Sequence, residues 1–396
     1  MSKIIIMLIM IVCFVLSLVV VFVNGIRCGV SCLQHRDSFL RIQALKKSGI
    51  AFLVVLILIF IVTWISQLAV YTPKIKGNDG KVLEGSIAEL RKLTVNGHKE
   101  WISIRGKDKT APVLLFLAGG PGGTQMAATR HELAALEEHF VVVNWDQPGS
   151  GKSYRCMKRS DITVQTYIND GVALTEYLLE QFGQSKIYLM GESWGSALGI
   201  FLISKKPEYY AGFIGTGQMV DFEETERMDY NKALEIASER KDQKTIDKLK
   251  KQGEPLYYSG NIAMQSATYL NYLSAYMGTD PNITNGGYNT FRDMFSSEYG
   301  MMDSVNYLLG IMNTFNAVYP QLYEMDLRDQ YVRVDVPVYF FLGRHDINAP
   351  ISIAEDYYDR LEASKKELIW FEHSGHSPWL NETDSFIKET VRVFLD

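Results

Sequence analysis

The chain begins with two long runs of hydrophobic residues. Residues 4–23 carry no charge and are almost all Ile, Val, Leu, Met and Phe, and residues 50–70 carry no charge either. Each run is long enough to cross the ~30 Å hydrocarbon layer of a bilayer as a helix. We therefore expect two transmembrane helices, at about 4–23 and 50–70. A cleaved signal peptide is the alternative for the first run, but that run is longer than a usual signal-peptide core and no small-x-small site ends it.

Basic residues fill the segment between the two runs. Residues 24–49 contain five Arg or Lys residues and a single acidic residue, Asp37. Loops rich in Lys and Arg stay on the cytoplasmic side of a membrane. The pattern predicts that residues 1–70 form a membrane anchor with a cytoplasmic loop. The N-terminus and everything after residue 70 would then lie outside the cytoplasm.

The rest of the chain alternates between strand-like and helix-like patterns. Residues 71–90 contain Pro, Gly and scattered Lys and are expected to be a linker, followed by one domain over 91–396. Helical patterns occur at 164–182, 352–362 and 384–395. Short apolar runs predict strands at 101–104, 113–117, 140–144, 187–190, 212–215, 336–342 and 368–371. Apolar strands that alternate with helices predict the α/β class, with a mostly parallel central sheet flanked by helices.

An insertion interrupts this alternation at about 220–332. It is rich in Tyr, Met and charged residues, with helical stretches at 223–241 and 243–251. We expect it to form a helical cap over the carboxyl edge of the sheet, where open α/β sheets bind their ligands.

Charge and cysteine content exclude some classes of function. The net charge of −5 and the isoelectric point near 5.9 argue against a nucleic-acid partner. Cys156 is the only cysteine beyond residue 70, so the domain forms no internal disulfide. Cys28 and Cys32 have no companion cluster of His or Cys, so we expect no metal site.

The first candidate for chemistry is Ser193, in Gly191-Glu-Ser-Trp-Gly195 directly after an apolar run. This is the G-x-S-x-G spacing of a nucleophile elbow, in which a sharp strand-to-helix turn exposes the serine hydroxyl. The spacing alone is a weak signal, because a Gly-rich connection with a capping serine has the same letters. A base, an acid and an oxyanion hole are needed to decide between the two interpretations.

Two later loops offer the base and the acid. His376 follows the last predicted strand, at the edge of the sheet where a loop can aim its ring at the elbow, and His373 is the local alternative. Asp346 follows the strand at 336–342 and could orient the imidazole, although aspartates that merely cap a helix are common. The order Ser193, Asp346, His376 is the order found in α/β hydrolases.

A glycine-rich loop follows the predicted strand at 113–117. Glycine lets the backbone approach a substrate closely, so the stretch from Gly119 to Gly123 is suited to an oxyanion hole. We assign one backbone donor to Gly120 and the other to Trp194, the residue after the nucleophile. The stretch lacks the G-K-[ST] of a phosphate-binding loop.

Together these motifs resemble the proline iminopeptidase group of α/β hydrolases. They occur in the same order and at comparable spacing over about residues 95–396. The resemblance implies a serine hydrolase with a helical cap and the triad Ser193, Asp346 and His376, and it supports Gly120 and Trp194 as oxyanion donors. The motifs are Ala118-Gly-Gly-Pro-Gly122, Asn144-Trp-Asp-Gln-Pro-Gly-Ser-Gly-Lys-Ser153, Gly191-Glu-Ser-Trp-Gly-Ser196, Gly343-Arg-His-Asp346 and Gly375-His376.

The chain departs from that group in two ways. Ala118 stands where the family usually has His, so one contact that supports the loop is absent. Family members that cleave N-terminal proline carry cap glutamates that hold the free amine of the substrate, often beside tryptophans, and the cap of this chain has no tryptophan. Glu223, Glu224 and Glu226 are the candidates for holding an amine. Their helical spacing fits a solvated face equally well.

These observations predict a membrane-anchored serine hydrolase that needs no cofactor. A small peptide with a free N-terminus is the expected substrate, and a small carboxylic ester is the alternative. A catalytically silent surface receptor on the same fold is the alternative from another class, because fold does not imply activity.

Overall fold

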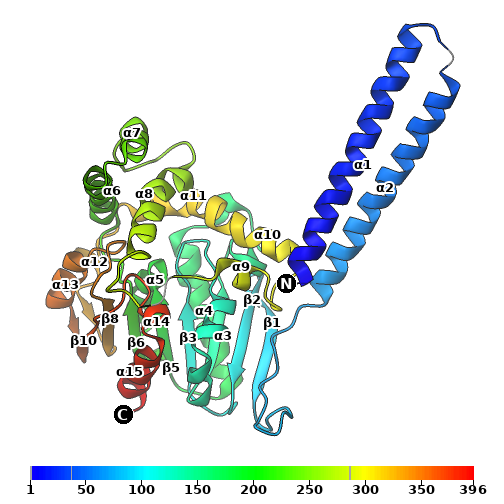
Figure 1. Cartoon of the computed structure of the whole chain (residues 1–396). Helices are drawn as coiled ribbons and strands as arrows, with labels where there is room; N and C mark the ends of the chain where they lie inside the picture. Colours follow the sequence, from blue (N-terminus) through cyan, green and yellow to red (C-terminus); the bar gives the residue numbers. More distant parts are fainter. Residues whose placement is uncertain (1, 37, 285–286) are drawn as a thin grey trace. The chain divides into compact units, whose positions relative to one another are not determined.

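The computed structural model describes residues 2–36, 38–284 and 287–396, which divide into two compact units (Figure 1). The first unit comprises the chain up to Tyr71 together with Met294–Val305. The second comprises Thr72–Asp293 and Asn306–Asp396. Asp37, the acidic residue of the predicted cytoplasmic loop, lies outside the described residues.

The first unit is dominated by a hairpin of two helices, α1 (Ser2–Leu33) and α2 (Phe39–Leu68) (Figure 1). α1 extends beyond the predicted span 4–23 at both ends, whereas α2 begins well before the predicted span 50–70 and ends two residues before its predicted end. In the described part of the chain, these two helices are long and apolar enough to cross a membrane. The share of residues buried within the structure is 0% for the most apolar window of α1 and 6% for that of α2. Such an exposed apolar surface is unusual for a helix that packs inside a soluble protein.

The second unit is built, over the described residues, on an eight-stranded sheet with the order β1-β2-β4-β3-β5-β6-β8-β10. The β1–β2 hairpin is antiparallel, β2 pairs antiparallel with β4, and the remaining neighbours are parallel. The strands are β1 (Ile87–Val95), β2 (His98–Gly106), β3 (Val113–Leu117), β4 (Val141–Asp146), β5 (Ile187–Glu192), β6 (Tyr210–Thr216), β8 (Val338–Gly343) and β10 (Lys366–Phe371). This is the α/β-hydrolase fold that the motif order predicts.

Helices cover both faces of the sheet, as the apolar strands require. On one face α4 (Val164–Phe182), α5 (Trp194–Lys205) and α13 (Ile351–Arg360) pack on side chains such as Leu115 and Val143. On the other face α3 (Met126–Glu132), α14 (Pro378–Asn381) and α15 (Thr383–Leu395) pack on the alternate side chains. Successive residues of a strand point to opposite faces, so an inner strand such as β3 contributes to both cores, with Leu115 on one face and Phe116 on the other.

The expected insertion is helical. Its longer helices are α6 (Phe222–Glu239), α7 (Gln243–Gln252), α8 (Ile262–Met277) and α10 (Met301–Leu309). Shorter helices are α9 (Thr290–Met294), α11 (Phe315–Val318) and α12 (Leu327–Gln330), and a π-helical turn at Gly310–Thr314 joins α10 to α11. A separate parallel pair, β7 (Arg333–Val334) and β9 (Glu362–Ala363), follows the cap.

The prediction of a linker over 71–90 is wrong at its C-terminal end. Strand β1 already begins at Ile87 and runs beside β2 over its whole length. The preceding residues are also held, because Arg105 donates to the Thr72 hydroxyl (2.7 Å) and to the Pro73 carbonyl (2.5 Å). Charged side chains such as Glu89 and Lys92 are exposed on this edge strand, so the segment lacks the apolar run by which the other strands were recognised.

Candidate active site

Ser193 lies at the turn between β5 and α5. Its backbone has φ 54° and ψ −124°, a region that residues other than glycine rarely occupy. The glycines on either side are needed for close packing. A side chain at Gly191 would lie 2.2 Å from the Gly195 carbonyl oxygen, and one at Gly195 would lie 2.1 Å from that of Leu117. The turn therefore has the local geometry of a nucleophile elbow rather than that of an ordinary capped connection.

His376 and Asp346 are brought together by the loops after β10 and β8. The Nδ1 atom of His376 lies 2.9 Å from Asp346 Oδ2. The other oxygen of Asp346 accepts from the backbone N–H groups of Asn348 (2.8 Å) and Ala349 (3.0 Å). The buried carboxylate is thus held in one orientation, and it fixes the imidazole so that Nε2 is left for the substrate side.

The alternative histidine does not reach the elbow. His373 is exposed, and its Nδ1 atom lies 3.2 Å from the Asn282 carbonyl oxygen. His376, in contrast, lines two cavities together with Ser193. Gly217 makes room for that ring, because a side chain there would lie 2.8 Å from His376 Cε1. The structure therefore places His376, and not His373, in the lining of the cavities that Ser193 shares.

Two opposing effects act on the pKa of His376. Burial disfavours the charged ring, but the Asp346 carboxylate and its hydrogen bond outweigh burial, and the charge of Glu192 adds to them. Together they raise the pKa of His376 to about 9. The imidazolium that would form during proton transfer is thereby stabilised.

The predicted oxyanion loop lies against the elbow. Gly120 has φ 140° and lines a cavity with Ser193, Trp194 and His376. Gln147, which the sequence interpretation did not single out, holds the arrangement together. It donates to the Ala118 carbonyl (3.0 Å) and accepts from the Trp194 indole N–H (3.0 Å). It thus joins the loop to the helix that follows the nucleophile.

The small cavity above Ser193, about 110 Å³ in volume, is mostly apolar but contains one acid. Asp229 of α6 lines it and is 1% exposed, and neither of its carboxylate oxygens has a hydrogen-bond partner among the described residues. Burial, together with the charges of Glu226 and Asp346, raises the pKa of Asp229 well above its usual value. An unpaired buried carboxylate is costly, and a cation beside it would remove that cost. The remaining lining residues are Met219, Phe222, Leu270, Phe315, Tyr319 and Asn348.

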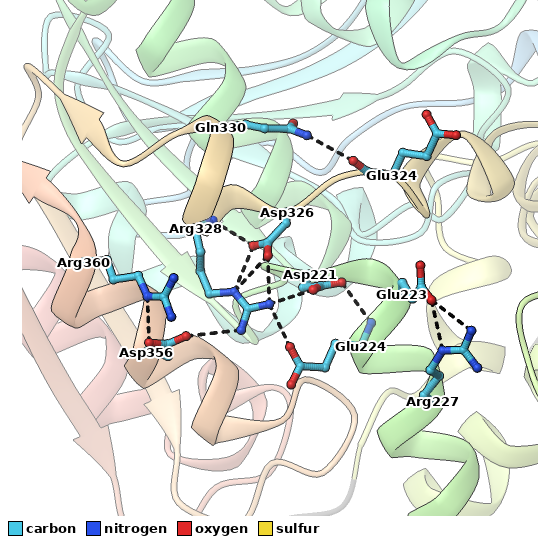
Figure 2. Close-up of polar contacts among 10 residues, drawn as sticks. All are labelled: Asp221, Glu223, Glu224, Arg227, Glu324, Asp326, Arg328, Gln330, Asp356 and Arg360. Carbon is cyan, nitrogen blue, oxygen red and sulfur yellow. Dashed lines mark hydrogen bonds and ion pairs between the residues drawn. The ribbon is translucent and has the colours of Figure 1, made fainter.

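The glutamates that the sequence suggested for amine binding take other positions. Glu223 pairs with Arg227 at 2.9 Å, and Glu224 pairs with Arg328 at 2.8 Å, both at solvent-exposed carboxylates (Figure 2). Arg328 also contacts Asp221 and Asp326. Glu223 and Glu224 therefore lie on the outer face of the cap.

Glu226 is buried, but its carboxylate is already occupied. The hydroxyl groups of Ser266 (3.1 Å), Tyr319 (2.8 Å) and Tyr269 donate to it. Asp229 follows Glu226 by three residues and so occupies the same face of α6. The spacing of three residues from Glu226 could have identified Asp229 as a candidate from the sequence, but Asp229 was not predicted.

A second titratable cluster lies at the start of β2. The Nε2 atom of His98 is 2.8 Å from Glu100 and 2.9 Å from Asp170. The hydrogen bonds to these carboxylates outweigh burial and raise the pKa of His98 to about 9. We interpret the cluster as an ion pair that ties β2 to α4.

The sequence profile of the α/β hydrolase fold family matches residues 112–383. A probable aminopeptidase of Bacillus subtilis, YbaC, is 30% identical over 331 residues, which cover 78% of this chain and 96% of that protein. A proline iminopeptidase of Saccharolobus solfataricus is 24% identical, with coverage of 82% and 96%.

The crystal structure of a proline iminopeptidase from Mycobacterium smegmatis shares the fold. Its TM-score is 0.55 at 16% identity, covering 77% of this chain and 97% of that one. The chain belongs to the α/β hydrolase family and is a hydrolase similar to aminopeptidases and proline iminopeptidases.

Proposed function

We propose that this chain is a serine aminopeptidase that is anchored in a membrane by the α1–α2 hairpin and removes the N-terminal residue from small peptides. The observation that carries the proposal is the buried carboxyl group of Asp229, which has no hydrogen-bond partner among the described residues and lines the same cavity as Ser193 and His376. A pocket for a neutral ester has no use for such a group. A peptide with a free N-terminus brings an ammonium group that would neutralise it.

The proposed chemistry follows the triad scheme. Ser193 Oγ attacks the carbonyl carbon of the first residue while His376 Nε2 takes the hydroxyl proton, and Asp346 holds the resulting imidazolium. The backbone N–H groups of Gly120 and Trp194 stabilise the negative oxygen. His376 then gives its proton to the departing amine as the peptide bond breaks, and a water molecule hydrolyses the acyl-enzyme by the same steps.

The size of the cavity supports a small N-terminal residue. Its volume of about 110 Å³ and its apolar lining by Met219, Phe222, Leu270 and Phe315 suit a compact apolar side chain. The ammonium group of the same residue would face Asp229 from α6. The carbonyl carbon would then lie toward the elbow, as cleavage of the first peptide bond requires.

We expect the full-length protein to react with a fluorophosphonate probe at Ser193 and to hydrolyse proline arylamides. Both follow from an activated serine and an amine-binding carboxylate in one cavity. Labelling is read by gel fluorescence and mass spectrometry, and turnover by release of the arylamine. Absence of labelling would favour a silent receptor on this fold. Labelling without arylamide turnover, but with hydrolysis of p-nitrophenyl acetate, would favour an esterase.

The hairpin and its charges support an orientation in the membrane. With the basic segment 24–49 in the cytoplasm, the catalytic domain lies outside. We expect protease treatment of intact cells lacking an outer barrier to remove material beyond residue 71 and leave the hairpin protected. Immunoblotting with antibodies to each part reads the result. A catalytic domain that is digested only after lysis would reverse the orientation.

A further inference from the structure

Glu192, the residue before Ser193, accepts hydrogen bonds from three different parts of the fold. Its Oε1 atom accepts from the Ser377 hydroxyl (2.5 Å) and from the Trp379 indole N–H (2.8 Å). Its Oε2 atom accepts from the Gln125 amide and from the Tyr288 hydroxyl of the cap. The side chain is 1% exposed. Hydrogen bonds to both oxygens hold this buried carboxylate in a single position.

The partners require Glu192 to act as an acceptor at both oxygens. An indole N–H can only donate, and it faces Oε1. The Gln125 amide faces Oε2 with its N–H₂ group, because its own carbonyl oxygen accepts from the Gly119 backbone N–H at 3.2 Å. A carboxylate accepts from all of these groups at once, whereas a neutral acid would lose one acceptor position.

These contacts connect Glu192 to both sides of the proposed machinery. Gln125 donates to Glu192 and accepts from the Gly119 backbone N–H, next to Gly120 in the oxyanion loop. That loop touches the elbow closely, since a side chain at Gly119 would lie 3.3 Å from Ser193 Cβ. On the other side, Ser377 directly follows His376. One buried carboxylate thus holds both the oxyanion loop and the histidine loop.

We propose that Glu192 is a positioning residue: through Gln125 and Ser377 it sets the oxyanion loop and His376 around Ser193. The inference rests on the proposed serine chemistry. It assigns a role to the first x of G-x-S-x-G, the residue directly before the serine, which the motif leaves unspecified.

The pH dependence follows from the groups around His376. Asp346 contacts its ring, Glu192 acts on it from the end of β5, and Asp229 and Tyr288 line cavities with it. Burial holds the pKa of Tyr288 well above its usual value, so that hydroxyl stays neutral. Because the base form of His376 is lost below its pKa of about 9, reactivity of Ser193 should rise from neutral toward alkaline pH. Removing the charge of Glu192 lowers that pKa.

The test is the rate of fluorophosphonate labelling of the full chain from pH 5 to 10, which does not depend on knowing the substrate. We expect Glu192→Gln to lower the plateau rate by about tenfold or more and to move the acid limb of the pH profile toward lower pH. Ser377→Ala keeps the charge but removes one donor. It should lower the plateau about fivefold and leave the acid limb in place.

Glu382→Gln is the matched control, because Glu382 accepts from the Ser374 hydroxyl (2.7 Å) and braces the same loop from its other side. Its acid limb should match that of the unmodified protein. A Glu192→Gln protein with an unchanged acid limb or an unchanged plateau would overturn the inference, as would a Ser377→Ala protein with an unchanged plateau. A folded, unmodified protein that is not labelled at all would instead refute the proposed function.

Discussion

Alanine at Ser193, His376 or Asp346 is expected to lower kcat by about 10³-fold or more while the protein stays folded, because members of a triad act as a unit. Without Ser193 no acyl-enzyme forms. Without His376 the hydroxyl keeps its proton. Without Asp346 the imidazole loses the partner that lies 2.9 Å from its Nδ1 atom. Steady-state kinetics on a proline arylamide reads the effect, and circular dichroism and thermal unfolding check the fold.

His373→Ala is the control for the histidine assignment. His373 is exposed and its Nδ1 atom lies 3.2 Å from the Asn282 carbonyl oxygen, so its loss should change kcat little. A crippled His373→Ala protein beside a nearly unaffected His376→Ala protein would show that the base has been assigned to the wrong histidine.

Asp229→Asn should lower kcat/KM for a proline arylamide by about 100-fold and leave hydrolysis of p-nitrophenyl acetate within about threefold. An ammonium group that loses its buried charged partner costs roughly 2–4 kcal/mol, whereas a neutral ester never used that partner. The substitution keeps the size of the side chain, so the fold should survive. Paired kinetics on the two substrates separates amine recognition from general damage.

The glutamates at the start of the cap supply matched controls. Glu223→Gln and Glu224→Gln remove exposed charges that pair with Arg227 and Arg328 (Figure 2), and both should behave like the unmodified protein on either substrate. Glu226→Gln disturbs hydroxyl partners behind Asp229 and should cost less than Asp229→Asn. Equal losses on arylamide and ester in the Asp229→Asn protein would contradict amine recognition and put the ester reaction first.

Local spacing explains why several features could be predicted from sequence. The elbow needs small residues on both sides of Ser193, and the reason is visible in the packing of Gly191 and Gly195 against neighbouring carbonyl groups. In a parallel sheet, loops after successive strands emerge at one edge, so chain order sufficed to single out Asp346 and His376. The long apolar runs identify the hairpin by length alone.

Edge strand β1 was not predicted, and its residues 87–90 fall in the expected linker, because its pattern is mixed. It mixes buried positions such as Ala88 with partly buried positions and exposed charges, and no long apolar run marks it. Its identity as a strand depends on pairing with β2. A local sequence pattern does not show which other strand a segment will pair with.

The sequence by itself determined the α/β class, the strained turn at Ser193 and the order of the groups around it, because each depends on spacing within a short segment or on the topology of parallel strands. Only the tertiary structure decided which acids face the cavity. Glu223, Glu224, Glu226 and Asp229 lie on one helix. Glu226 and Asp229 are buried, and Glu226 accepts from hydroxyl groups of α8 and Tyr319, whereas the exposed Glu223 and Glu224 pair with arginines. Glu192 likewise gains its role from donors distant in the chain, since a buried carboxylate is defined by the groups that fold around it.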